Sequence, residues 1–152
     1  KAEDLNQHYD GIVLPGGEST VQGKLMKELG MFDIIKSQIK NDMPVLATCA
    51  GMILLADKLE ADSKVHLQTI PMTVKRNAYG RQLGSFHTNA TIKGMTFIRA
   101  PYVSQVSDEV EILSVVEERI VAVRYQKQIA LAFHPELDND LRIHEMFLSL
   151  CK

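Results

Sequence analysis

The chain has 152 residues, enough for one domain with a substantial core, and its 45% hydrophobic and 24% charged residues are typical of a globular protein. A net charge of -2 without a long basic run disfavours nucleic acid or an acidic membrane as a partner. No apolar run is long enough to span a bilayer, and we expect no signal peptide. Two cysteines make no disulfide framework, and five histidines lack metal-ligand spacing, so we expect a cytoplasmic protein without a metal site.

The first half of the chain predicts strands that alternate with helices. Residues 11–14 are a short apolar run typical of a buried strand, and residues 15–20 end it in a glycine-rich turn that lets the backbone approach a ligand. Residues 21–29 predict a helix that Ser19 or Thr20 could cap, and isoleucines between residues 34 and 39 predict another. This order is typical of a parallel sheet covered by helices, in which ligands bind beyond the carboxyl ends of the strands.

Residues 44–56 place one cysteine between two apolar runs, which predicts a strand, a sharp turn and a helix that runs to about residue 59. The pattern is that of a nucleophile elbow, with Cys49 in the position that other hydrolases give to serine. The N-terminus of the following helix would face the sulfur and lower the thiol pKa. The alternative is a buried cysteine that packs as a small hydrophobic residue.

The second half predicts strands joined by hairpin-like links, at residues 72–75, 86–92, 96–101, 112–116, 120–125 and 128–133. A closing amphipathic helix is predicted by apolar residues at helical spacing: Ile143, Met146, Phe147 and Leu150. Because there is no internal repeat or linker, we expect residues 1–152 to form a single α/β domain.

His134 and Glu136 are the expected partners of Cys49. His134 follows a predicted strand, as Cys49 does, and its imidazole can act as both base and acid near neutral pH. Glu136 lies two residues further on, so its carboxylate can accept a hydrogen bond from one imidazole nitrogen and leave the other facing the sulfur. This arrangement is that of a Cys-His-Glu triad. The alternative is an ordinary surface turn.

A thioester mechanism also needs donors for the oxyanion. The backbone N–H groups of Gly17 and Ala50 are the natural pair, one from the glycine turn and one directly after the nucleophile. Arg76 and Arg99 are candidates for holding a charged or polar substrate, and the alternative for each is an ordinary surface arginine.

Three motifs, in this order along the chain, resemble those of the class I (triad) glutamine amidotransferases: LPGGES at residues 14–19, TCAG at 48–51 and FHPE at 133–136. Two further strings, KRNAYGRQ at 75–82 and FIRAP at 97–101, are similar to those of the glutaminase subunits of pyridoxal 5'-phosphate synthases. The resemblance implies a three-layer α/β/α, flavodoxin-like domain whose mixed sheet has antiparallel strands in its second half. Family members begin with a further strand and helix, which we expect this chain to lack.

The resemblance implies that Cys49 attacks the side-chain amide of L-glutamine and releases ammonia, that water then yields L-glutamate, and that His134 and Glu136 assist. It also implies glutamine-binding positions, with no cofactor: Gly17, Glu18, Ser19, Arg76, Ile98 and Arg99. The ammonia would pass, within a large hetero-oligomer, to a (β/α)8-barrel subunit. That subunit makes pyridoxal 5'-phosphate from ribose 5-phosphate and glyceraldehyde 3-phosphate, and glutaminase activity is expected to be weak until it docks.

Other hypotheses stay open. The chain could be the glutaminase domain of another amidotransferase, which the string at residues 75–82 disfavours. It could be a catalytically silent subunit that only binds its partner, which the intact Cys49, His134 and Glu136 disfavour. A chaperone or peptidase relative with a cysteine elbow usually lacks the downstream His-Pro-Glu.

Overall fold

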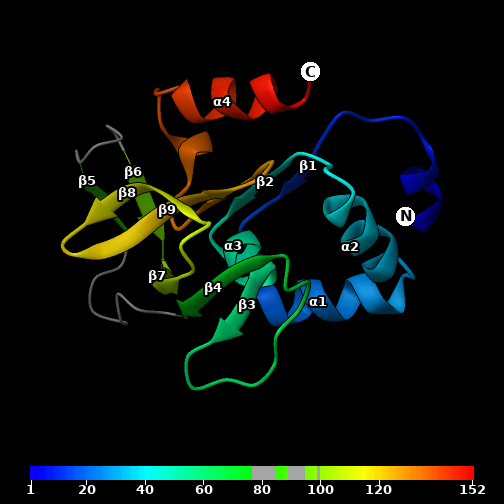
Figure 1. The fold of residues 1–152 in the computed structure, drawn as a ribbon, viewed down its shortest axis with the longest axis horizontal. Coiled ribbons are helices and arrows are strands. Elements are labelled where there is room, and N and C mark those ends of the chain that lie inside the picture. The colour runs from blue at the N-terminus through cyan, green and yellow to red at the C-terminus, as the bar shows by residue number, and fades with distance from the viewer. Residues whose placement is uncertain (77–84, 89–94, 99) are drawn as a thin grey trace.

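The structure is a computed structural model that describes residues 1–76, 85–88, 95–98 and 100–152, with only the backbone of residues 85–88 and 95–98 (Figure 1). Its helical elements are α1 (Ser19–Glu28), α2 (Phe32–Lys40), α3 (Ala50–Leu55) and α4 (Arg142–Leu150), with short 3-10 helices η1 (Ala2–Asn6) and η2 (Pro135–Leu137). Its strands are β1 (Ile12–Leu14), β2 (Val45–Thr48), β3 (Ala56–Leu59), β4 (Ile70–Lys75), β5 (Ser85–Thr88), β6 (Met95–Ile98), β7 (Tyr102–Val106), β8 (Glu111–Val116), β9 (Arg119–Tyr125) and β10 (Gln128–Leu131).

The main sheet is mixed, with strand order β1-β2-β10-β9-β7-β4-β3. An eighth strand, β8, pairs with β9 and is not part of this order. The strands β1, β2 and β10 run parallel, whereas β9 is antiparallel to β10, β8 and β7. The remaining described strands, β5 and β6, form a separate antiparallel pair. The antiparallel pairs lie in the second half of the chain as the sequence predicts, but the last strand, β10, returns to pair parallel with β2, and β3 pairs parallel with β4.

Helices cover both faces of the parallel half of the sheet. In Figure 1, α4 lies on one side of β1 and β2, and α1 and α3 lie on the other. All residues of β2, β10 and α3 are buried, which is the expected pattern for central strands and for a helix enclosed by neighbours. The predicted amphipathic helix is confirmed as α4, whose Ile143 and Phe147 are buried.

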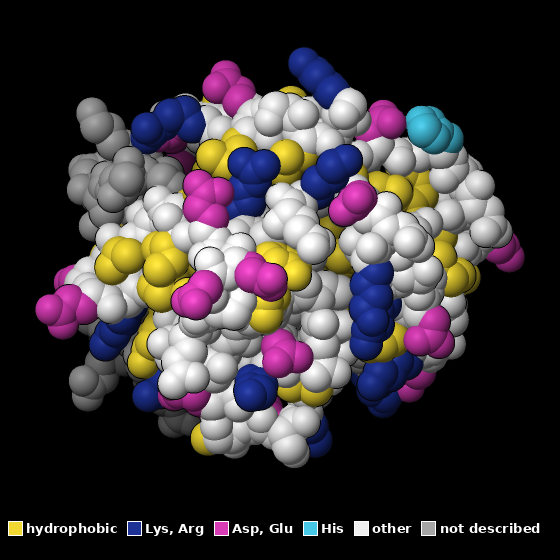
Figure 2. Space-filling model, in the orientation of Figure 1, with side chains coloured by type: hydrophobic (Ala, Val, Ile, Leu, Met, Phe, Trp, Pro, Cys, Tyr) yellow, Lys and Arg dark blue, Asp and Glu magenta, His cyan; other side chains and the backbone are white. Residues whose placement is uncertain are grey.

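The surface is mixed in charge. On the face that Figure 2 shows, basic and acidic side chains are interspersed, in keeping with the small net charge. None of the helices in the described part of the chain is long and apolar enough to cross a membrane.

Three details of the predicted elements were wrong. The helix after Cys49 ends at Leu55, because the chain turns at Ala56 into β3, which pairs with β4. The N-cap of α1 is Glu18 rather than Ser19 or Thr20, since its carboxylate accepts the Val21 N–H at 2.8 Å. The strand β7 was missed. Of the strand predicted at residues 86–92, residues 86–88 lie in β5 and the rest lie outside the described residues.

The close approach of α3 to β1 depends on a glycine. A Cβ at Gly51 would lie 2.2 Å from the backbone oxygen of Leu14, and a backbone atom cannot move aside as a flexible side chain can. Any side chain at this position would therefore push the helix away from the sheet.

We predict that Gly51→Ala destabilises the fold by about 1–3 kcal/mol, the usual cost of overpacking, although Gly→Ala inside a helix normally stabilises it. Urea unfolding followed by circular dichroism measures the change. Gly30→Ala is the control, because a Cβ there meets nothing within 4 Å and adds only the strain of a φ of 70°. A Gly51→Ala variant as stable as the wild type would contradict this packing.

Candidate functional site

Three loops meet where β1, β2 and β10 end. Leu14 pairs with Ala47 and Thr48 pairs with Leu131, so the three parallel strands end level with one another. The N–H of Cys49 then donates to the Leu131 oxygen at 2.8 Å, which ties the cysteine to the end of β10. Parallel strands thus carry the glycine turn, Cys49 and the segment of His134 to one edge of the sheet.

The glycine turn and His134 are in direct contact. A Cβ at Gly16 would lie 2.5 Å from Cε1 of the His134 ring, so only glycine leaves room for the imidazole. Gly17 has a φ of 136°, a conformation that side chains rarely adopt. The expectation that Gly16, Gly17 and Cys49 share one edge of the sheet is confirmed.

Cys49 sits at a sharp turn between β2 and α3. Its φ of 50° and ψ of -104° are outside the regions that non-glycine residues favour. Such a backbone costs about 1–3 kcal/mol and persists only where its surroundings impose it. Here the buried α3 and the β10 hydrogen bond impose it, which gives the predicted elbow geometry.

Burial raises the pKa of the Cys49 thiol, a hydrogen bond from the Ala50 backbone lowers it, and the Glu136 charge raises it further. The helix N-terminus does lower this pKa, through the Ala50 N–H, but the predicted net lowering was wrong. The helix has only six residues, and the thiol is 8% exposed, so loss of hydration outweighs the helix. Burial therefore favours the neutral thiol over the thiolate at this position.

The predicted contact between His134 and Glu136 is present. The imidazole Nδ1 lies 2.8 Å from Glu136 Oε1, with the histidine mostly buried and the carboxylate half exposed. An ionised carboxylate only accepts hydrogen bonds, so Nδ1 carries the hydrogen and Nε2 is left as an acceptor. This contact sets the tautomer that a base for the thiol requires.

Gln22 holds the glycine turn and was not predicted from the sequence. Its Nε2 donates to the carbonyl oxygens of Pro15 at 3.2 Å and of Gly16 at 3.1 Å. The signal in the sequence is weak, because a polar side chain one turn into a helix usually faces solvent. Ser19, at the start of α1, is buried, and its hydroxyl has no hydrogen-bond partner among the described residues.

Arg76 reaches the glycine turn from the end of β4. Its guanidinium pairs with Glu18 at 2.9 Å and with Asp62 at 3.1 Å, so the structure brings together two of the predicted substrate-binding residues and one that was not predicted. Of the two remaining positions, Ile98 is described only as backbone in β6, and Arg99 lies outside the described residues.

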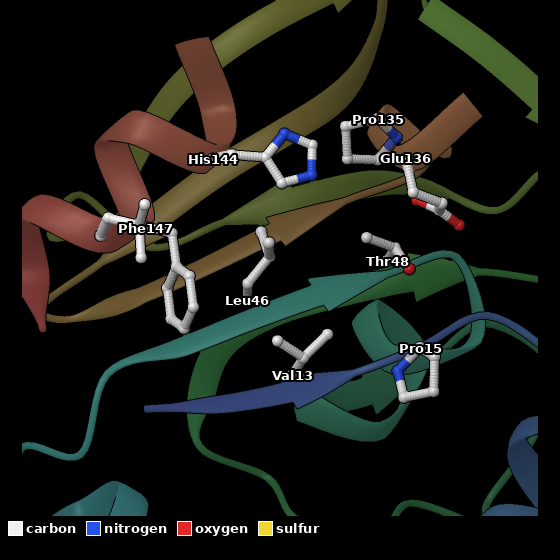
Figure 3. A pocket seen from close by; sticks show the side chains of 9 residues that line it. Val13, Pro15, Leu46, Thr48, Pro135, Glu136, His144 and Phe147 are labelled. Atoms are coloured by element: carbon white, nitrogen blue, oxygen red, sulfur yellow. The ribbon is translucent and has the colours of Figure 1, made fainter. Parts of the chain in front are cut away.

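A cavity of about 430 Å³ lies between the sheet and α4 (Figure 3). Apolar side chains of Val13, Leu46 and Phe147 form its wall, and Glu136 lies at one end. Cys49 does not line it, so this cavity is separate from the thiol's immediate surroundings.

The model of the SNO glutamine amidotransferase family matches residues 1–152. The chain belongs to this family. A "Pyridoxal 5'-phosphate synthase subunit PdxT" of Desulfitobacterium hafniense is 56% identical over 151 residues, covering 96% of this chain and 76% of the relative. The Haemophilus influenzae protein of the same name is 47% identical over 158 residues, covering 99% of this chain and 82% of the relative.

Solved structures agree with this SNO family assignment. A crystal structure of a glutamine amidotransferase matches with a TM-score of 0.91 and 35% identity, covering 99% of this chain and 83% of the other. A glutamine amidotransferase from Thermotoga maritima matches with a TM-score of 0.56 and 17% identity, covering 84% and 56%, which supports the fold alone. The predicted fold class is confirmed.

The backbone strain at Cys49 predicts how two substitutions there change the stability of this SNO family member. Glycine adopts a positive φ without strain, so Cys49→Gly should be more stable than Cys49→Ala by about 1 kcal/mol, against the usual preference for alanine. Chemical denaturation of both variants measures the difference. Equal stabilities would mean that the turn relaxes when the thiol is removed.

The raised pKa of the Cys49 thiol can be tested by alkylation. In a Cys151→Ser background, the rate of Cys49 alkylation against pH should give a pKa above the ordinary value of about 8.5. Glu136→Gln should lower that pKa, because it removes a negative charge that disfavours the thiolate. Glu145→Gln, on the exposed side of α4, is the control and should leave it unchanged. A wild-type pKa at or below about 8.5 would contradict the conclusion that burial has the largest effect on the pKa of Cys49.

Proposed function

We propose that this chain is the glutaminase subunit of a pyridoxal 5'-phosphate synthase, which hydrolyses L-glutamine to L-glutamate and ammonia through a cysteine thioester. One observation carries the proposal. A strained cysteine elbow lies at the sheet edge that also holds the glycine turn and the hydrogen-bonded His134–Glu136 pair, in a chain of the SNO glutamine amidotransferase family. The relatives are named as subunits of pyridoxal 5'-phosphate synthase, and this name indicates which synthase would use the ammonia.

The proposed chemistry follows from the proton positions. Nε2 of His134 takes the thiol proton as the Cys49 sulfur attacks the amide carbon of glutamine. The C–N bond then breaks, the imidazolium gives its proton to the departing nitrogen, and ammonia leaves a glutamyl thioester. Water, activated by the same imidazole, attacks the thioester carbon, and the C–S bond breaks to release glutamate and restore the thiol. Glu136 stabilises the imidazolium in both steps.

The oxyanion of each tetrahedral intermediate would be bound by backbone N–H groups of Gly17 and Ala50. Glu18 and Arg76 carry the charges that suit the ammonium and carboxylate of an amino acid. We include the remaining predicted positions in this proposed glutamine site: Ser19, Ile98 and Arg99.

The partner would be a (β/α)8-barrel synthase subunit, with both chains in a large hetero-oligomer in the cytoplasm. Both cysteines are free thiols, which suits a reducing compartment. The raised pKa of the Cys49 thiol is consistent with activation by docking, because a docking change that brings the His134 base to the sulfur would favour transfer of its proton.

The test is glutamate release by the purified chain, alone and titrated with the barrel subunit. We predict that activity rises with the barrel subunit to a saturating value, and that Cys49→Ala abolishes it, a loss of about a thousandfold or more. Cys151→Ala is the control, because this second thiol lies at the end of α4 and should be dispensable.

Each failure has a distinct meaning. Activity that survives in Cys49→Ala would refute the thioester mechanism. A wild-type chain that binds the barrel subunit but releases no glutamate would instead be the silent, partner-binding subunit. Activity that does not change across the titration would refute the proposed partner.

A further inference from the structure

The Arg76 guanidinium is held between two segments that are distant in sequence. On one side, its Nη2 donates to Glu18 Oε1 at 2.9 Å and to Thr20 Oγ1 at 3.3 Å, at the start of α1. On the other side, its Nη1 donates to Asp62 Oδ2 at 3.1 Å, in the turn after β3. The side chains of Arg76 and Asp62 are only 24% and 28% exposed, so solvent screens this contact less than an ordinary surface ion pair.

Asp62 is itself fixed in place. Its other oxygen, Oδ1, accepts the backbone N–H of Lys64 at 2.8 Å, and its backbone bridges to Leu59 at the end of β3. The Lys64 hydrogen bond, together with Arg76, holds the pKa of Asp62 below its usual value, so the carboxylate is ionised at neutral pH. A carboxylate with both oxygens engaged presents a rigid surface to the guanidinium.

The segment that carries Asp62 is also anchored to the helices behind the site. His66 is 8% exposed and packs on α1, where a Cβ at Gly23 would lie 2.1 Å from its Nδ1. The N–H of Leu67 donates to the Leu54 oxygen of α3 at 2.8 Å. Asp62 therefore has a fixed position relative to α1, whose first turn follows Glu18.

We propose that Asp62 is a positioning residue for glutamine binding, which holds the Arg76 guanidinium at the mouth of the site. A guanidinium has five N–H donors, and the contacts with Glu18, Thr20 and Asp62 use three of them. The two donors left, Nε–H and one N–H of Nη1, face different edges of the guanidinium, so one of them can meet the substrate's α-carboxylate, and Asp62 decides where it points. This inference rests on the proposed glutaminase function, and it assigns a role to a residue outside every motif of the sequence.

Loss of Asp62 should weaken binding rather than chemistry. Without it, one end of the guanidinium is released, and the long side chain regains rotamer freedom that binding must then remove. The reacting groups at Cys49 and His134 do not touch Asp62, so the chemical steps should proceed at their normal rate once glutamine is bound. The signature is a higher KM with an almost unchanged kcat.

The experiment measures glutaminase kinetics of the chain saturated with the barrel subunit. We predict that Asp62→Ala raises KM for glutamine by roughly three- to tenfold, while kcat stays within about twofold. Asp62→Asn has one acceptor oxygen, which can serve Arg76 or Lys64 but not both, so its KM should lie between those of the wild type and Asp62→Ala. In an Arg76→Ala background, Asp62→Ala should have no further effect, because the group that it positions is gone.

Glu60→Ala is the matched control. It removes a carboxylate from the same turn, one that pairs with Lys75 at 3.9 Å rather than with Arg76, and should leave KM unchanged.

An Asp62→Ala variant with unchanged or lower KM, or with kcat reduced in proportion, would overturn the inference. So would an equal effect in the Arg76→Ala background. If Asp62→Ala does not fold, Asp62→Asn still decides in the Arg76→Ala background, since a rise in KM there as large as in the wild-type background refutes the positioning geometry. A wild type without glutaminase activity refutes the proposed function instead.

Discussion

The turn at Cys49 is the constraint on which the rest of the site depends. One residue must end β2, reverse the chain and begin α3, and it does so with a positive φ that only a rigid environment maintains. The environment consists of the hydrogen bond to Leu131, the burial of the whole of α3, and the glycine at position 51 that lets α3 lie against β1. The backbone and the core therefore place Cys49 at this turn.

The same arrangement limits the electrostatics of the site. A position that is buried enough to be rigid is also poorly hydrated, and poor hydration raises the thiol pKa. The Glu136 charge disfavours a thiolate on Cys49, while its hydrogen bond with Nδ1 orients the His134 ring. Proton transfer from sulfur to imidazole conserves the net charge of the three groups. A local change that favours the ion pair, such as a bound substrate or partner, can therefore shift the proton without any further titration.

The parts of this site that could be predicted are those set by local sequence and by strand direction. Parallel strands that end in a glycine turn, a cysteine and a histidine bring these residues to one edge, and Glu136 follows His134 by only two residues. The parts that could not be predicted depend on contacts that no local sequence pattern specifies. Gln22 reaches back to the turn before its own helix, and Asp62 meets an arginine 14 residues away. The same is true of the end of α3, which pairing between β3 and β4 decides.

In the proposed mechanism, a raised thiol pKa at Cys49 also has a physical advantage between turnovers. Thiolates are the species that oxidants and electrophiles attack, and a thiol that is 8% exposed with a raised pKa presents little thiolate and little surface. The strain energy stored in the backbone is not released by protonation, because φ at Cys49 is set by α3 and by β10. The geometry needed for attack is thus retained while the reactive charge is absent. In the proposed mechanism, position and reactivity are therefore controlled separately, the first by buried packing and the second by proton transfer from Cys49 to His134.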